Sequence, residues 1–183
     1  MNAVKTKLSS AVIIEPDVFG DSRGWFYESY SQKKLADLGI NEVFVQDNRS
    51  FTALSGTIRG LHCQTPPMAQ AKLLTCLRGE IMDVAVDVRL GSPTYKQWVS
   101  VILSGENKKM FFIPEGFLHG FLTLSDDVEV MYKVNRFYSK ENDMSIKFND
   151  PAIGVEWGIT SPILSDKDKN ALSLEQAALE FKY

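Results

Sequence analysis

The chain has 183 residues, 44% of them hydrophobic, which suffices for one well-buried core and is too short for two ordinary domains. Its 20 basic and 23 acidic residues nearly cancel and are scattered, which disfavours a nucleic-acid-binding protein but not a small anionic ligand. No apolar run approaches the roughly 18 residues of a membrane span and no secretion signal opens the chain, so we expect one cytoplasmic domain over residues 1–183.

The first predicted element is a short helix over residues 32–38, which Ser31 is placed to cap and Gly39 to end in the left-handed conformation. A second helix is expected from Ser173, where Gln176 completes a capping box and an apolar stripe extends to Phe181. Between them, turn residues separate β-rich runs at 42–46, 72–77, 81–88, 98–103, 109–113, 121–124, 128–134 and 145–148. Strands this evenly spaced, with so little helix, predict an antiparallel sandwich, jelly roll or barrel.

The chain contains only two histidines, His62 and His119, and glycines flank both of their segments. A glycine within a strand allows a ligand or another backbone to come close, as at the wall of a pocket. The segment Pro-x-Gly-x-x-His that ends at His119 matches the second sequence signature of the cupin fold. We therefore expect an all-β double-stranded β-helix, the cupin jelly roll, with short peripheral helices near the N- and C-termini. A single histidine in a strand is more often a core residue. The functional interpretation therefore depends on both histidines lying in glycine-flanked segments.

Metal-binding cupins add a first signature with two histidines and a glutamate, whereas this chain has His62-Cys63-Gln64 with no acidic residue before Lys72. A catalytic metal needs about three converging N, O or S ligands, so we expect neither a metal nor a cofactor. His62 is then available as a general base, because imidazole titrates near neutral pH. Cys63 and Cys76 lack the spacing of a zinc site, and we expect both to be reduced and structural.

Two strand residues admit both a structural and a functional interpretation. Lys72 opens an otherwise apolar run, so it either extends its ammonium from a strand end to solvent or stabilises an enolate oxygen beside a ketone. Tyr132 either packs, as strand tyrosines usually do, or returns a proton to the opposite face of a sugar.

Eight short segments, within a stretch from about residue 12 to residue 170, resemble the ordered motifs of the dTDP-4-dehydrorhamnose 3,5-epimerase family. They are FGDSRG (19–24), FVQDN (44–48), GTIRGLH (56–62), DVAVDVR (83–89), SPT (92–94), PEGFLHGF (114–121), YK (132–133) and LSDKD (164–168). Any one alone is weak, whereas the ordered set is specific. The resemblance implies an isomerase that converts dTDP-4-dehydro-6-deoxy-D-glucose to dTDP-4-dehydro-L-rhamnose by deprotonation and reprotonation at C3 and C5, next to the C4 ketone.

The resemblance also implies roles for individual residues. His62 corresponds to the proton acceptor, Asp168 to the carboxylate that orients it, and Tyr132 to the proton donor. Lys72 would lie at the ketone oxygen, and Tyr138 would stack on the thymine ring. The positions that match the substrate-binding set are Arg23, Phe26, Glu28, Gln46, Asn48, Arg59, Lys72, His119, Tyr138, Asp143 and Lys167.

Family members are homodimers in which an N-terminal strand of one subunit joins the sheet of the other, so Arg23 and Glu28 would serve the partner's site. Three residues depart from the family pattern: Cys63 replaces an aromatic residue, Ala71 a glycine and Asp143 a glutamate. None of them removes a residue with a chemical role, but they can change sugar selectivity.

Other functions remain open from the sequence. On the same scaffold these are an epimerase that acts at C3 or C5 only and a 3,4-ketoisomerase. A non-catalytic cupin that binds a sugar and a metal-dependent cupin oxygenase are the alternatives of another class. The presence of both His62 and Tyr132 favours an epimerase, whereas the number of carbons epimerised depends on the pose of the substrate.

Overall fold

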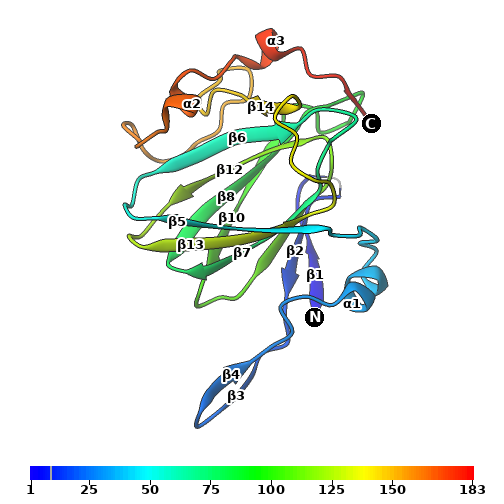
Figure 1. Cartoon of the computed structure of the whole chain (residues 1–183), viewed down its shortest axis with the longest axis vertical. Coiled ribbons are helices and arrows are strands. Elements are labelled where there is room, and N and C mark those ends of the chain that lie inside the picture. Colours follow the sequence, from blue (N-terminus) through cyan, green and yellow to red (C-terminus); the bar gives the residue numbers. More distant parts are fainter. Residues whose placement is uncertain (9) are drawn as a thin grey trace.

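Two antiparallel sheets face each other in a computed structural model that describes residues 1–8 and 10–183 (Figure 1). The larger sheet has the order β1 (Asn2–Lys5), β2 (Val12–Glu15), β11 (Met110–Ile113), β7 (Lys72–Arg78), β13 (Val128–Val134) and β5 (Gln46–Thr52). The smaller has the order β10 (Trp98–Ser104), β8 (Glu80–Asp87), β12 (Phe117–Thr123), β6 (Ile58–Gln64) and β14 (Asp143–Ser145). Neighbours in each sheet come from distant parts of the chain, as in a jelly roll, so the predicted fold class is confirmed.

The remaining elements are short and peripheral. A hairpin of β3 (Phe19–Asp21) and β4 (Gly24–Phe26) projects from the body (Figure 1). Strand β9 (Arg89–Leu90) pairs in parallel with β15 (Phe181–Lys182). The helices are α1 (Gln32–Asp37), α2 (Asp166–Lys169) and α3 (Leu174–Ala177). No helix in the described part of the chain is long and apolar enough to cross a membrane.

Three apolar clusters hold these layers together. The cluster between the two sheets includes Ile81 and Ala85 of β8, whereas Val84 and Val86 of the same strand pack on the other side, under the C-terminal segment. The third cluster lies between the larger sheet and α1, whose buried residue is Leu35. Because both faces of the central strands are covered, these strands are apolar almost continuously instead of alternating.

The helix predictions are confirmed in part. Ser31 caps α1 by accepting a hydrogen bond from the backbone N–H of Lys34, and Gly39 follows with φ 85°. Ser173 and Gln176 form the expected capping box of α3. The predicted apolar stripe to Phe181 is wrong as a helix, because Ala178 turns left-handed and Phe181 pairs with β9 as a strand.

The strand predictions fail mainly at sheet edges. Residues 42–45 form a loop because β13, which pairs with the edge strand β5, ends at Val134 opposite Gln46. The run at 145–148 is shifted, since β14 ends at Ser145, and β12 begins at Phe117, four residues before the predicted start. Strand β6, the N-terminal strands and β5 beyond Gln46 lie outside the predicted runs. The glycine of β6 and the polar residues of β5 hide their pairing, whereas β2 is a short apolar run that the prediction did not include.

Candidate active site

The two histidines lie directly opposite each other on neighbouring strands. In the pairing of β6 with β12, His62 is the partner of His119, so both side chains reach the same face of the smaller sheet. Glycines beside them let the strands approach: a Cβ on Gly60 would lie 2.5 Å from Cα of Gly120. Here the flanking glycines admit another backbone, which is one of the two outcomes that the sequence predicted.

A polar cavity opens between the sheets at this point. It consists of two adjoining hollows of about 220 Å³ and 270 Å³, which share His62, Lys72, Tyr132 and Lys167. The first is also lined by Gln46, Asn48, Cys63, Gln64, Gln70, Tyr138 and Asp143, and the second by Ser50, Arg59, His119, Phe121, Ser165 and Asp168. The larger sheet and the smaller sheet therefore supply opposite walls of one site.

His62 is paired with a buried carboxylate. Its Nε2 lies 2.5 Å from Oδ1 of Asp168, and the hydroxyl of Ser165 donates to Oδ2 of the same carboxylate at 2.8 Å. Burial raises the pKa of Asp168, but the His62 and Ser165 hydrogen bonds and the charge of Lys167 outweigh it and lower the pKa below its usual value. An ionised carboxylate only accepts, so Nε2 carries the hydrogen and Nδ1 is left to take a proton. The structure thus places His62 and Asp168 in direct contact, and their roles in catalysis stay a prediction.

Lys72 and Tyr132 occupy the facing wall. Tyr132 pairs with Leu74 across the β13–β7 ladder, which makes Lys72 its diagonal neighbour. Burial lowers the pKa of Lys72, and its ammonium makes no hydrogen bond to the residues that the structure describes. Burial raises the pKa of Tyr132 and keeps it a neutral phenol at neutral pH, although Arg59 opposes the shift. The amine of Lys72 and the phenol of Tyr132 thus stand across the cavity from His62.

Asp143, a predicted binding residue, joins two other predicted residues at the edge of the cavity. Its Oδ2 accepts a hydrogen bond from the hydroxyl of Tyr138 at 3.2 Å and from the ammonium of Lys167 at 2.6 Å. The negative charge of Asp143 raises the pKa of Tyr138, whose ring is exposed. On the neighbouring wall the amide of Gln46 donates to Oδ1 of Asn48 at 2.8 Å.

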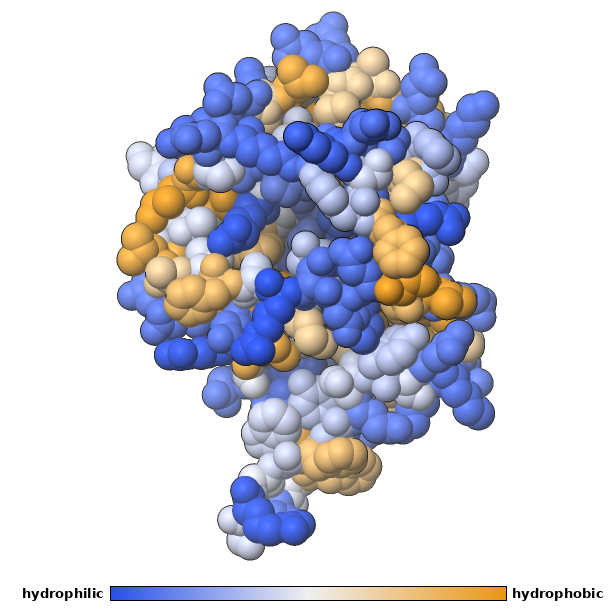
Figure 2. Space-filling view, in the orientation of Figure 1, coloured by the Kyte–Doolittle hydropathy of each residue, from blue (hydrophilic) through white to orange (hydrophobic). Residues whose placement is uncertain are grey.

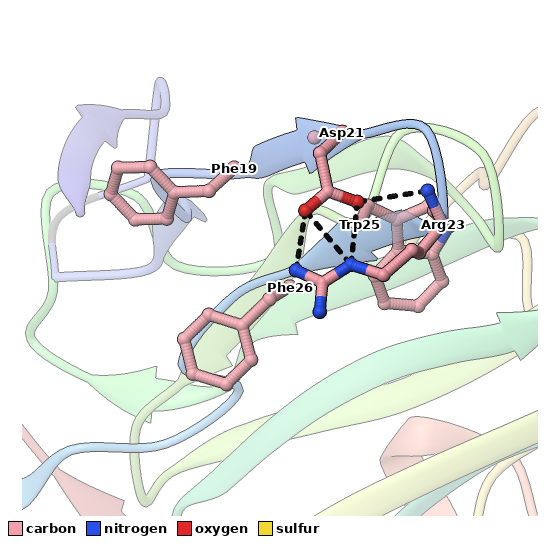
Figure 3. Close-up of a pocket in the computed structure, with 7 residues that line it drawn as sticks. Phe19, Asp21, Arg23, Trp25 and Phe26 are labelled. Atoms are coloured by element: carbon pink, nitrogen blue, oxygen red, sulfur yellow. Dashed lines mark hydrogen bonds and ion pairs between the residues drawn. The ribbon is translucent and has the colours of Figure 1, made fainter.

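Three predicted binding residues lie outside this cavity. Arg23 and Phe26 belong to the β3–β4 hairpin, where the guanidinium of Arg23 contacts Asp21 at the tip (Figure 3). Glu28 follows the hairpin and forms an ion pair with Lys34 of α1. Within one chain these residues lie away from His62, because the hairpin extends away from the sheets (Figure 2). The expectation that Arg23 and Glu28 serve the site of a partner subunit stays a prediction.

Some cavity residues were missed in the sequence. The set comprises Ser50, Gln64, Gln70, Phe121 and Ser165, together with the buried acid Asp83 beneath the cavity. Two signals were available: Ser50 continues the alternation from Gln46 and Asn48, and Ser165 stands three residues before Asp168, as an N-cap does.

Neither cysteine is in a disulfide, and both are buried. Burial raises the pKa of Cys63 to about 12 and that of Cys76 to about 11, so both are neutral thiols at physiological pH. In the described residues no group of three or more His, Cys, Asp or Glu side chains is arranged to hold a metal ion.

A jelly-roll enzyme with acid–base groups on opposite walls of a polar cavity is the class that this fold and site define. Residues 5–176 match the family model of dTDP-4-dehydrorhamnose 3,5-epimerase. The epimerase of Shigella flexneri is 51% identical over 93% of this chain and 94% of its own length. The solved epimerase of Bacillus anthracis has a TM-score of 0.93 at 48% identity and covers 94% of this chain and 99% of its own. The epimerase of Legionella pneumophila, solved with dTDP-4-keto-L-rhamnose, has a TM-score of 0.94 at 46% identity, and the match covers 100% of this chain and 98% of its own.

The chain belongs to the dTDP-4-dehydrorhamnose 3,5-epimerase family and is a carbohydrate epimerase. The family predicted from the eight motifs is therefore confirmed.

Proposed function

We propose that the protein converts dTDP-4-dehydro-6-deoxy-D-glucose to dTDP-4-dehydro-L-rhamnose by moving protons at C3 and C5. The observation that carries this proposal is the placement of the His62–Asp168 pair and of Tyr132 on opposite walls of a cavity that Lys72 also lines. Inversion of a carbon needs a base on one face and an acid on the other, and this cavity has both. The family membership and the Legionella pneumophila complex support the substrate class.

In this mechanism the C4 ketone acidifies the hydrogens on C3 and C5. Nδ1 of His62 takes one of them, and Asp168 stabilises the resulting imidazolium. The ammonium of Lys72 stabilises the enolate oxygen, and the phenol of Tyr132 donates a proton to the opposite face of the carbon. Before the second carbon reacts, His62 releases its proton to solvent and Tyr132 regains one.

The nucleotide would occupy the edge of the cavity. The exposed ring of Tyr138 suits stacking on thymine, while Gln46 and Asn48 offer polar groups near it. Lys167 and Arg59 carry the charges that suit a diphosphate. We assign Asp143 to the same region, because it holds both Tyr138 and Lys167.

The N-terminal hairpin supports a homodimer in which strands are exchanged. Phe19, Trp25 and Phe26 are 66%, 61% and 66% exposed, a gathering of large apolar side chains that single soluble domains seldom present to water (Figures 2 and 3). In such a dimer Arg23, Phe26 and Glu28 would contribute to the partner's site.

Mixed dimers test this arrangement. Arg23→Ala and His62→Ala subunits are each expected to be inactive or weak alone. If the hairpin serves the partner, mixing and refolding them restores activity, because one of the two sites then has both intact groups. No recovery in mixed dimers of verified composition would contradict the exchange.

We infer that residues 1–183 form one catalytic domain, which works in the cytoplasm without a metal or other cofactor. Two buried, unpaired thiols fit a reducing compartment.

Incubation with the keto-sugar in D₂O tests the function directly. We expect deuterium at both C3 and C5 of the product. Label at one carbon would reduce the activity to a mono-epimerase, and migration of the ketone would indicate a ketoisomerase. Nucleotide-sugar binding without exchange would indicate a non-catalytic cupin.

A further inference from the structure

Asp83 is a buried acid that the proposed mechanism does not use. It lies at the centre of β8, between Val101 of β10 and Phe121 of β12, and 0% of its surface is exposed. Alternation along the strand directs its side chain to the same face as Ile81 and Ala85, which belong to the core between the sheets. A carboxylate in this position is costly unless hydrogen bonds and charges compensate it.

The compensation comes from residues of the cavity. Oδ2 of Asp83 lies 3.0 Å from Nε2 of His119, which lines the cavity. Oδ1 is buried and has no hydrogen-bond partner among the residues that the structure describes. The charge of Asp83 acts favourably on the ammonium of Lys72, which lines the same cavity.

We propose that Asp83 is a positioning residue for the epimerase reaction: a buried counter-ion that orients His119 and stabilises the ammonium of Lys72 beside the ketone. This inference rests on the proposed function, because it assigns Lys72 to the enolate oxygen. Asp83 lies beneath the cavity wall and acts through its two neighbours, so it is not itself a catalytic residue.

The role of His119 follows from its hydrogen bond. The carboxylate of Asp83 accepts, so Nε2 of His119 carries the hydrogen and Nδ1 remains as the other ring nitrogen. Burial lowers the pKa of His119. The charges of Lys72 and His62 lower it further, whereas Asp83 raises it. The ring is therefore neutral at neutral pH, and its Nδ1 can accept a hydrogen bond from a sugar hydroxyl.

The charge of Lys72 is supported from the same side. The groups around it that carry charge or titrate come from several elements: Asp83 of β8, Asp143 of β14, Lys167 of α2, His62 and the thiol of Cys63 on β6, His119 of β12 and Tyr132 of β13. Burial lowers the pKa of Lys72, and the charge of Lys167 lowers it further. The charges of Asp83 and Asp143 raise this pKa. Without Asp83, the ammonium would lose its proton at a lower pH.

The test compares Asp83→Asn with Asp87→Asn. Asp87 is a second acid of β8 with 0% exposure, but it binds Arg89, Ser92 and Thr94 and does not line the cavity. The first variant should lower kcat by up to about a hundredfold, because Lys72 loses the counter-ion that supports its ammonium beside the enolate oxygen, and should raise KM, because His119 loses the partner that orients it. It should also move the alkaline limb of the kcat profile to lower pH and leave dTDP affinity unchanged. The control should lower Tm and leave the alkaline limb unchanged.

A second measurement needs neither substrate nor a variant of Asp83. The chain has two histidines, so ¹⁵N NMR of the imidazoles resolves both, and the His62→Gln variant assigns them. We expect His119 in the neutral form with the hydrogen on Nε2 at pH 7. The Nδ1–H form, or a ring charged at that pH, would overturn the orienting role even if Asp83→Asn does not fold.

Unchanged kcat and an unchanged alkaline limb in folded Asp83→Asn would overturn the counter-ion role. Failure of the proposed function can be distinguished from failure of the counter-ion role, because it would appear as absence of deuterium exchange in the wild-type protein. In that case the NMR result still reports on the pairing of Asp83 with His119.

Discussion

The cavity contains two histidine–aspartate pairs that use the same chemistry in different surroundings. The side chain of His62 is 28% exposed, and Asp168 reaches it from α2 at the periphery. The side chain of His119 is 10% exposed, and Asp83 reaches it from the centre of a sheet. The first pair can exchange protons with a ligand and solvent, whereas the second is enclosed. We therefore expect surroundings, and not residue type, to separate the proposed base His62 from the proposed binding residue His119.

Exchanging each histidine for alanine is the strongest test of this difference. We expect His62→Ala to lower kcat by about 10²- to 10⁴-fold, because a positioned general base is lost. His119→Ala should act mainly on KM, because it removes a binding contact. Steady-state kinetics with the keto-sugar measure both. Equal losses of kcat would show that the two pairs do not differ in role.

Removing the charge of Asp168 tests how far the base depends on its partner. Asp168→Asn keeps the size of the side chain but no longer stabilises the imidazolium, so kcat should fall, by at most the roughly 10²- to 10⁴-fold expected for loss of the base itself. Titration of dTDP provides the control, since nucleotide affinity should not change. If Asp168→Asn turned over as fast as the wild-type protein, His62 would act independently of the carboxylate.

The pH dependence of turnover should reflect Lys72. Its lowered pKa means that the ammonium deprotonates below the ordinary lysine value of 10.5, so activity should decline at alkaline pH before that value. Tyr132 does not set this limb, because its pKa is raised. In Lys72→Arg, kcat should be lower but the alkaline decline should move upward, because guanidinium does not titrate in this range. An unmoved limb would assign it to another group.

Ser165→Ala should have a smaller effect on both stability and rate. Ser165 caps α2 and donates to Asp168, so its loss should cost about 1 kcal/mol of unfolding free energy. Turnover should fall only severalfold, since His62 still holds the carboxylate. Urea denaturation and kinetics measure the two effects. Ser173→Ala, at the cap of α3, is a matched control that should affect stability alone.

Cys63→Ala should change turnover least. The thiol lines the cavity, but with a pKa of about 12 it is neutral and supplies no base or nucleophile. We expect kcat unchanged and at most a modest change in KM. A large loss of kcat would assign Cys63 a chemical role.

Much of the cavity could be predicted because most of its residues lie in specific motifs. His62, His119, Tyr132 and Asp168 belong to four of the eight motifs, whereas Lys72 was predicted as a charge that opens an apolar run, and the cavity brings all five together. Asp83 was not identified as a functional candidate, although it opens one of the eight motifs, because a single acid in an apolar run gives no sign of its neighbours. Its importance depends on a ladder that places it diagonally across from His119.

The hairpin residues show the opposite case. Arg23 and Glu28 were identified by motif, but one chain leaves them outside the cavity. Similarly, the apolar stripe that ends at Phe181 satisfies a helix period, and only the pairing with β9 makes this residue part of a strand. Local patterns do not contain the partner that decides between two conformations.

By itself, the sequence determined the jelly-roll class, the family and most of the residue types at the site, because turn spacing, alternation and ordered motifs are local properties of a chain. Only the tertiary structure decided which acid pairs with which histidine, which wall each group occupies and how deeply it is buried. Those properties depend on strand register between segments far apart in the chain. Register in turn determines the distances and the desolvation that give identical side chains different chemistry.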